Sequence, residues 1–302
     1  MERKLIKQGG GGYTIYLPKK WIDLNKLQQG DRIDLEIADN CLIIKNENKD
    51  LKKEIDINIT TNVETSVRTL MTNAYRLGYN VVKVHYADPK ILDIIDHVIK
   101  TRLLGYEIIS SNDNGCVIEN ITEPSYEHAE NIFLKVMYNI TLLLDKTEEM
   151  LKGKNCYEEV LELERKIQQF DNFVRRATII ERKAETPLLW IFHTELIHAQ
   201  REIFLLARYL SNTNIKVSKD IKEYFNDVKD IFQLLKDGYL KKDIKLLEQV
   251  HDLEKKLVYK EGYLLLSTKK GKEQILVHRI TNSIRTFYLA SSPLIGLFLW
   301  KR

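Results

Sequence analysis

Residues 3–45 constrain the fold more than any other stretch, because they alternate short strand patterns with turns. Two runs place apolar side chains at every second residue, as in a strand with one buried face: Tyr13, Ile15 and Leu17, then Ile33, Leu35 and Ile37. Pro18 ends the first strand because it has no N–H for a ladder, and Asp39-Asn40 marks a tight hairpin before Cys41–Ile44. About four short strands in some forty residues cannot bury a core alone, so we expect this stretch to pair, most simply with a second copy of itself.

The order of these pieces resembles a known family. A strand is followed by the glycine run Gly9–Gly12, by Leu17–Trp21, by a short polar helix, by Gly30–Arg32 and by a hairpin. Over residues 3–46 this arrangement is similar to the AbrB/MazE/SpoVT swapped-hairpin family. The resemblance implies an intertwined dimeric β-barrel and DNA binding through basic side chains. The residues expected in the barrel core and dimer contact are Tyr13, Ile15, Leu17, Trp21, Ile33 and Leu35. The glycine run does not indicate a P-loop, because no Gly-Lys-Ser/Thr follows it.

Charge gives separate support for a nucleic-acid role. The whole chain has 47 basic and 43 acidic residues, so a nucleic-acid site must come from a local patch. Residues 1–32 contain seven basic residues against three acids, and a dimer would double that excess into one surface. The alternative is that Lys4 and Lys7 only keep an exposed strand edge from pairing. The candidate DNA-binding residues are Arg3, Lys4, Lys7, Lys19, Lys20 and Arg32.

Residues 47–123 predict a small α/β domain with the order β-α-β-α-β-β. A helix over 63–77 should end at Gly78, and Asp88-Pro89 should begin a second helix. The last two strands should form a hairpin across Asn114-Gly115. No dinucleotide fingerprint is present, so no cofactor is expected. A spacer is the default role for this domain, and a ligand-sensing role stays open.

Residues 124–302 predict an all-α region, because apolar residues recur there at three- and four-residue steps. A polar break at Ser211–Asn214 divides about six helices into two sets of three, over 124–212 and 215–302, and Gly238 should break the chain again. Short connections favour antiparallel bundles. The expected fold class is therefore multidomain α+β: a swapped-hairpin barrel, a small α/β domain and all-α bundles.

Two tandem three-helix units of this size resemble the PhoU family of phosphate-uptake regulators, over about residues 126–302. In that family, the third helix of each unit carries a Glu-x-x-x-Asp pattern that can hold metal clusters. Here Glu195 is followed at the fourth position by Ala199, and the second unit has His278 and Asn282 where carboxylates would stand. We therefore do not transfer a metal site, and no metal is expected.

Other chemistry is weak in this sequence. His193 and His198 are five apart, about 140° around a helix, so they do not form a zinc-protease face. Glu164 and Asp171 share a helical face and are at best a weak residual metal site. No serine, cysteine or lysine has a nucleophile context, so an enzyme is not expected. Three scattered cysteines and the absence of an apolar run of ~18 residues predict a cytoplasmic protein without a membrane span.

These patterns favour a dimeric, cytoplasmic, DNA-binding transcriptional regulator, with the PhoU-like resemblance implying control of phosphate uptake. Its expected partners are DNA, a second copy of the chain and a phosphate transporter ATPase or another regulator. The main alternative is an adaptor that dimerises through its N-terminus and restrains the transporter without specific DNA binding. An antitoxin is disfavoured, because about 250 residues of patterned sequence follow residue 46 where such proteins have a short disordered tail.

Overall fold

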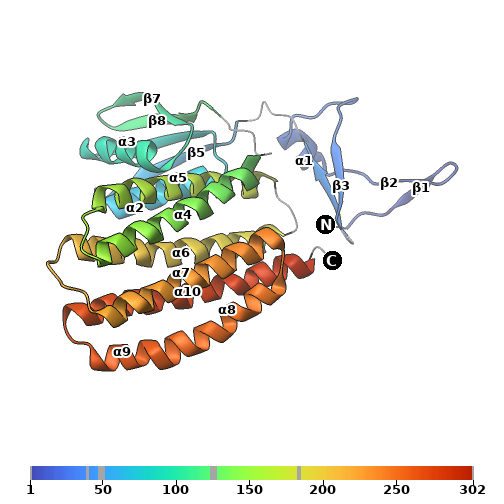
Figure 1. Cartoon of the computed structure of the whole chain (residues 1–302). Helices are drawn as coiled ribbons and strands as arrows, with labels where there is room; N and C mark the ends of the chain where they lie inside the picture. The colour runs from blue at the N-terminus through green and yellow to red at the C-terminus, as the bar shows by residue number, and fades with distance from the viewer. Residues whose placement is uncertain (1, 39–40, 47–51, 123–127, 182–184, 301–302) are drawn as a thin grey trace. The chain divides into compact units, whose positions relative to one another are not determined.

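The computed structural model describes residues 2–38, 41–46, 52–122, 128–181 and 185–300 (Figure 1). The chain divides into two compact units, residues 1–53 and 54–302. The first unit is built from short hairpins, and the second combines a small mixed sheet with a large helical region. The helical C-terminal half is therefore confirmed.

The described residues of the N-terminal unit form two hairpins and one short helix: β1 (Ile6–Gln8), β2 (Gly12–Thr14), α1 (Lys19–Leu24), β3 (Asp34–Ala38) and β4 (Cys41–Lys45). The hairpins form separate two-stranded sheets, β1 with β2 and β3 with β4, so the single chain does not show the closed barrel. The prediction of a strand through Ile15 and Leu17 is wrong for the single chain, because β2 ends at Thr14. Among the described residues, no strand lies beside 15–18 to pair with them. The predicted turn at Asp39-Asn40 lies outside the described residues.

The second unit begins with a four-stranded sheet and two helices: β5 (Glu54–Ile59), α2 (Glu64–Arg76), β6 (Val81–Tyr86), α3 (Lys90–Arg102), β7 (Tyr106–Asn112) and β8 (Gly115–Asn120). The strand order is β5-β6-β8-β7; β5 and β6 are parallel and the other pairs antiparallel. This is the β-α-β-α-β-β order that the sequence predicts. As expected, Asp88 caps α3, with its carboxylate accepting from the backbone N–H of Lys90 at 3.0 Å.

The predicted turn at Asn114-Gly115 is shifted by one residue. Asn112 pairs with Gly115, so Asp113 and Asn114 form the turn and Gly115 begins β8. Glycine is required at this position for a different reason. A Cβ on Gly115 would lie 2.5 Å from the carbonyl oxygen of Val84 on the neighbouring strand.

The described residues of the helical region form six long helical segments, one of which contains a π-helical stretch: α4 (Ala129–Leu151), α5 (Tyr157–Glu181), α6 (Thr186–Ser211), α7 (Lys219–Lys241), α8 (Ile244–Lys256) continued by a π-helix (Leu257–Gly262) and α9 (Tyr263–Thr268), and α10 (Lys272–Trp300). The predicted break near residue 213 is present between α6 and α7. The predicted break at Gly238 is wrong, because this residue lies buried inside α7. Its Cβ would lie 2.6 Å from a methyl carbon of Leu247, so glycine there lets α8 pack closely against α7.

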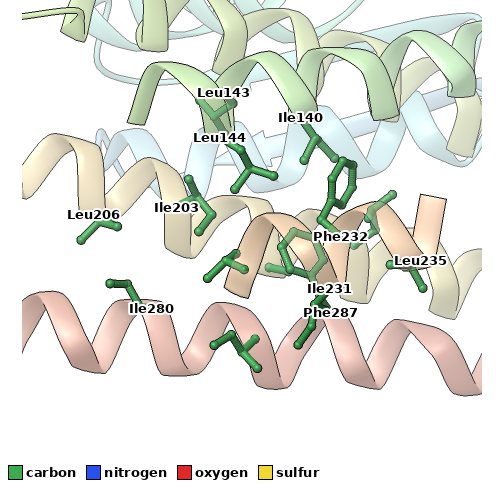
Figure 2. Close-up of a cluster of buried hydrophobic side chains, with 14 of the residues drawn as sticks. Ile140, Leu143, Leu144, Ile203, Leu206, Ile231, Phe232, Leu235, Ile280 and Phe287 are labelled. Atoms are coloured by element: carbon green, nitrogen blue, oxygen red, sulfur yellow. The ribbon is translucent and has the colours of Figure 1, made fainter. Parts of the chain in front are cut away.

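One hydrophobic core joins both sets of three helices (Figure 2). Side chains from α4, α6, α7 and α10 meet there: Ile140, Leu143, Leu144, Ile203, Leu206, Ile231, Phe232, Leu235, Ile280 and Phe287. Each such buried side chain contributes roughly 1.5–3 kcal/mol relative to an exposed one. A second cluster lies between the sheet and helices α2 and α3. The stability of the second unit therefore rests on two cores.

Helix α5 carries the polar side chains that hold the α2–α3 layer. Arg76 donates to the Asn172 amide oxygen at 2.7 Å, and Asp171 accepts from Arg175 at 2.8 Å and from Arg76 at 3.4 Å. Glu164 accepts from Gln200 and lies 3.8 Å from the Arg102 guanidinium. Both members of the Glu164–Asp171 pair therefore face arginine, which gives them a structural role in joining the two layers.

Candidate nucleic-acid interface

The β1–β2 hairpin fixes the first group of candidate residues. Lys7 lies opposite Tyr13 in the register, and the Thr14 hydroxyl donates to the Ile6 carbonyl at 3.3 Å. Arg3 and Lys4 lie in the non-helical segment that leads directly into β1. Three of the six predicted DNA-binding residues therefore lie within five consecutive positions at the start of one hairpin.

The other three candidate residues flank helix α1. Lys19 and Lys20 form its first turn, directly after Pro18. Arg32 follows the turn before β3, where the Gln28 backbone N–H donates to the Asp31 carboxylate at 2.7 Å. That hydrogen bond holds one of the few local acids in the turn.

All six candidate side chains are exposed. None of them forms an ion pair with any residue that the structure describes. Exposed, unpaired lysine and arginine side chains are the groups that contact nucleic-acid phosphates, where they release counterions and make affinity depend on salt. The arrangement can thus bind a polyanion without first breaking internal ion pairs.

The same unit exposes an unusual amount of apolar surface. Among the described side chains of residues 2–46, none is buried. Of the predicted core residues, Leu17, Trp21 and Ile33 are half-buried, while three are open: Tyr13 (65% exposed), Ile15 (45%) and Leu35 (59%). The single chain thus leaves the predicted barrel core uncovered.

Hairpin β3–β4 has one continuous apolar face. Leu35 pairs with Ile44 and Ile37 pairs with Leu42, so all four side chains lie on the same side; we call this the apolar hairpin face. Ile37 is 82% exposed. Sequence reasoning did not assign a role to Leu42 or Ile44, although their alternation across the predicted turn was a usable signal. A face of this kind, on a unit whose described side chains are all at least partly exposed, needs a partner surface.

The predicted weak sites in the helical region do not converge. His193 is buried against the Phe133 ring at 4.3 Å between centroids, whereas His198 is exposed on the opposite side of α6. His278 instead contacts the Asn282 amide at 3.2 Å. Within the described parts of the chain, no group of three or more His, Cys, Asp or Glu is placed to hold a metal ion. Cys116 and Cys156 are buried, and burial raises the pKa of the Cys116 thiol to about 11.

None of the helices in the described ranges has both the length and the apolar character needed to cross a bilayer. Comparison of the chain with protein-family models, with curated proteins and with solved structures gives no match.

Proposed function

We propose that this chain is a dimeric, DNA-binding transcriptional regulator. The observation that carries the proposal is the N-terminal unit, which combines six exposed basic residues with an uncovered apolar face. Within its described part, these six residues form no ion pair and no side chain is buried. Two copies that cover each other's apolar hairpin faces would complete a core and double the positive charge. The resemblance of residues 3–46 to the swapped-hairpin family supports the same assembly.

In the proposed complex, Arg3, Lys4 and Lys7 of each protomer contact the DNA backbone from the paired first strands. Lys19, Lys20 and Arg32 add positive charge beside them. The helical body, by its resemblance to the PhoU family, is proposed as the sensing or interaction part that links DNA binding to phosphate uptake. Its single core across both three-helix sets would let it respond as one piece.

The expected DNA affinity has a defined salt dependence. If three basic residues of each protomer contact phosphates, a dimer neutralises about six, and log K should fall against log salt with a slope of roughly −5. The double variant Arg3→Ala/Lys4→Ala removes four of those contacts per dimer and should reduce the slope to about −2. Fluorescence anisotropy with DNA from the protein's own promoter and with scrambled DNA, across a salt series, measures both.

A matched control removes the same number of positive charges from outside the proposed interface. Lys255→Ala/Lys260→Ala removes two exposed lysines from α8 and the π-helix, and it should leave the slope near that of the unaltered chain. A promoter preference that persists at physiological salt supports a regulator. Equal, salt-sensitive binding to both DNAs that is untouched by the Arg3/Lys4 change would favour the adaptor that acts on a transporter without specific DNA binding.

Dimerisation through the apolar hairpin face is tested separately. Ile37→Glu places a carboxylate in the proposed interface, where burying an unpaired charge is costly, so the chain should become monomeric at micromolar concentration. The same substitution at Ile109, an exposed residue of edge strand β7, should leave the dimer intact. Analytical ultracentrifugation measures the mass, and a dimeric Ile37→Glu protein would contradict the proposed interface.

A further inference from the structure

A cavity of about 380 Å³ lies among helices α4, α6, α7 and α10 of the second unit. It is lined by Glu130, Leu189, Tyr239, Lys242, Leu294, Leu297 and Phe298. Cavities of about 300–1,000 Å³ with mostly apolar walls and a few polar groups are the usual sites of small molecules. The apolar C-terminal end of α10 supplies three of these lining residues, Leu294, Leu297 and Phe298. The hydrophobic sequence of this helix end therefore lines the cavity as well as packing in the bundle core.

The inner wall is aromatic and fixed by packing. The Tyr239 ring lies 5.2 Å from the Phe133 ring and 5.8 Å from the Phe192 ring, measured between centroids. Phe133 and Phe192 are buried in the main core. Tyr239 is therefore held in place on one side, while its other side contributes to the cavity.

Three polar groups share the cavity, and they differ in charge. Glu130 is acidic, Lys242 is basic and Tyr239 offers a hydroxyl. The two charged side chains are exposed to solvent, whereas Tyr239 is half-buried. None of the three side chains hydrogen-bonds or forms an ion pair with another residue in the described ranges. Burial raises the pKa of Tyr239, and the nearby Glu130 carboxylate raises it further, so the phenol stays protonated. Lys242 ends α7 in the left-handed region, with φ of 53°.

We propose that this cavity binds a small zwitterion with an apolar body, namely a free α-amino acid with an aliphatic or aromatic side chain. Its ammonium group would pair with Glu130, its carboxylate with Lys242, and its body would contact Leu189, the end of α10 and the Tyr239 ring. A purely apolar molecule would pair with neither charged side chain. A simple amine or acid would pair with one of the two charged side chains and so make one charge-assisted contact fewer than a zwitterion.

Isothermal titration calorimetry of the full chain tests the head-group requirement with L-leucine and L-phenylalanine. Leucine without its carboxylate (3-methylbutylamine) and leucine without its ammonium (4-methylpentanoate) are the matched probes. We expect at least one of the two amino acids to bind at millimolar concentration or below. We expect each of the two probes to bind at least tenfold more weakly than leucine.

Two variants test which charged group of the ligand pairs with Glu130 and which pairs with Lys242. Glu130→Gln should weaken amino-acid binding at least tenfold and leave 4-methylpentanoate unaffected, whereas Lys242→Gln should weaken the amino acid and leave 3-methylbutylamine unaffected. Glu248→Gln and Lys245→Gln, exposed positions on α8 outside the cavity, should bind as the unaltered chain does. Leu189→Trp should fill the cavity and abolish binding, with thermal unfolding confirming that the variant is folded.

The proposal is overturned if neither amino acid binds at millimolar concentration. It is also overturned if a probe with one head group binds as tightly as leucine, or if the cavity variants bind as the controls do. The experiment uses no DNA, so its outcome is independent of the proposed regulator function.

Discussion

Replacing Arg176 by methionine is expected to lower the free energy of unfolding by about 3 kcal/mol, through loss of hydrogen bonds from a charged donor and of cation–π contacts. Arg176 is 1% exposed. It donates to the backbone carbonyls of Tyr75 at 2.8 Å and Tyr79 at 2.9 Å, and its guanidinium lies 5.0 Å from the centre of the Tyr75 ring. Methionine keeps most of the side-chain volume but donates no hydrogen bond. Urea unfolding monitored by circular dichroism measures the change.

Arg165→Met on the same helix is the matched control. Arg165 is about half exposed and its only described ion pair is with Glu162, at 3.9 Å. Exposed pairs of this kind contribute little, so this variant should lose less than about 0.5 kcal/mol. Equal losses in the two variants would mean that Arg176 does not hold the α2–α3 layer on α5. The Arg176 variant should also show faster amide exchange in α2 than the control, because α2 loses its hydrogen bond and cation–π contact with Arg176 of α5.

The chain is expected to lose stability on acidification because of one buried histidine. His193 is 3% exposed, and burial lowers its pKa from 6.5 to about 4, despite the opposing effect of nearby Asp171. Among the described residues, its Nδ1 atom has no hydrogen-bond partner. The folded chain therefore disfavours the charged ring, whereas the unfolded chain binds the proton readily. The free energy of unfolding that depends on the neutral His193 ring is fully present above pH 6.5. It is lost progressively as the pH falls from 6.5 toward 4.

His193→Phe should remove this pH dependence, because phenylalanine carries no titrating group. Its ring can keep the aromatic contacts with Phe133 and Phe192. Between pH 7.5 and pH 5, the unaltered chain should lose about 2 kcal/mol more than the variant. His198→Phe, at an exposed position of the same helix, should keep the loss. Thermal or urea unfolding at the two pH values gives the comparison. Parallel pH profiles for His193→Phe and the unaltered chain would show that His193 is not the titrating group.

Local sequence signals predicted most element positions. Asp88 caps α3, the polar stretch after Ser211 separates two sets of helices, and the helix and strand order of residues 54–120 agrees with the periodicity. Such signals act within a few residues of one another, so a sequence contains them directly. The two misread glycines show the limit. Gly115 and Gly238 suggested a turn and a break. In the structure, each glycine instead leaves room for a neighbouring element, with Val84 of β6 close to Gly115 and Leu247 of α8 close to Gly238.

The candidate interface was predicted in its charges and only partly in its geometry. The basic residues were identifiable because charge and spacing near residue 1–32 are properties of the sequence itself. The apolar hairpin face depends on the pairing of Leu35 with Ile44 and Ile37 with Leu42, which the strand register decides. The alternating apolar residues in 13–17 predicted a strand. In the structure, strand β2 ends at Thr14, because extending β2 through residue 17 would need a neighbouring strand to pair with.

The sequence by itself determined the element order, the helical second half and the basic N-terminus, because periodicity, capping and charge are local. Only the tertiary structure decided which polar side chains are buried together and what they contact. Glu164 and Asp171 lie seven residues apart on one helix, which suggested a weak metal site. Packing of this helix against α2 and α3 instead places Arg76 beside Asp171 and Arg102 beside Glu164. The same packing buries His193, and helix ends far apart in sequence enclose the cavity beside Tyr239.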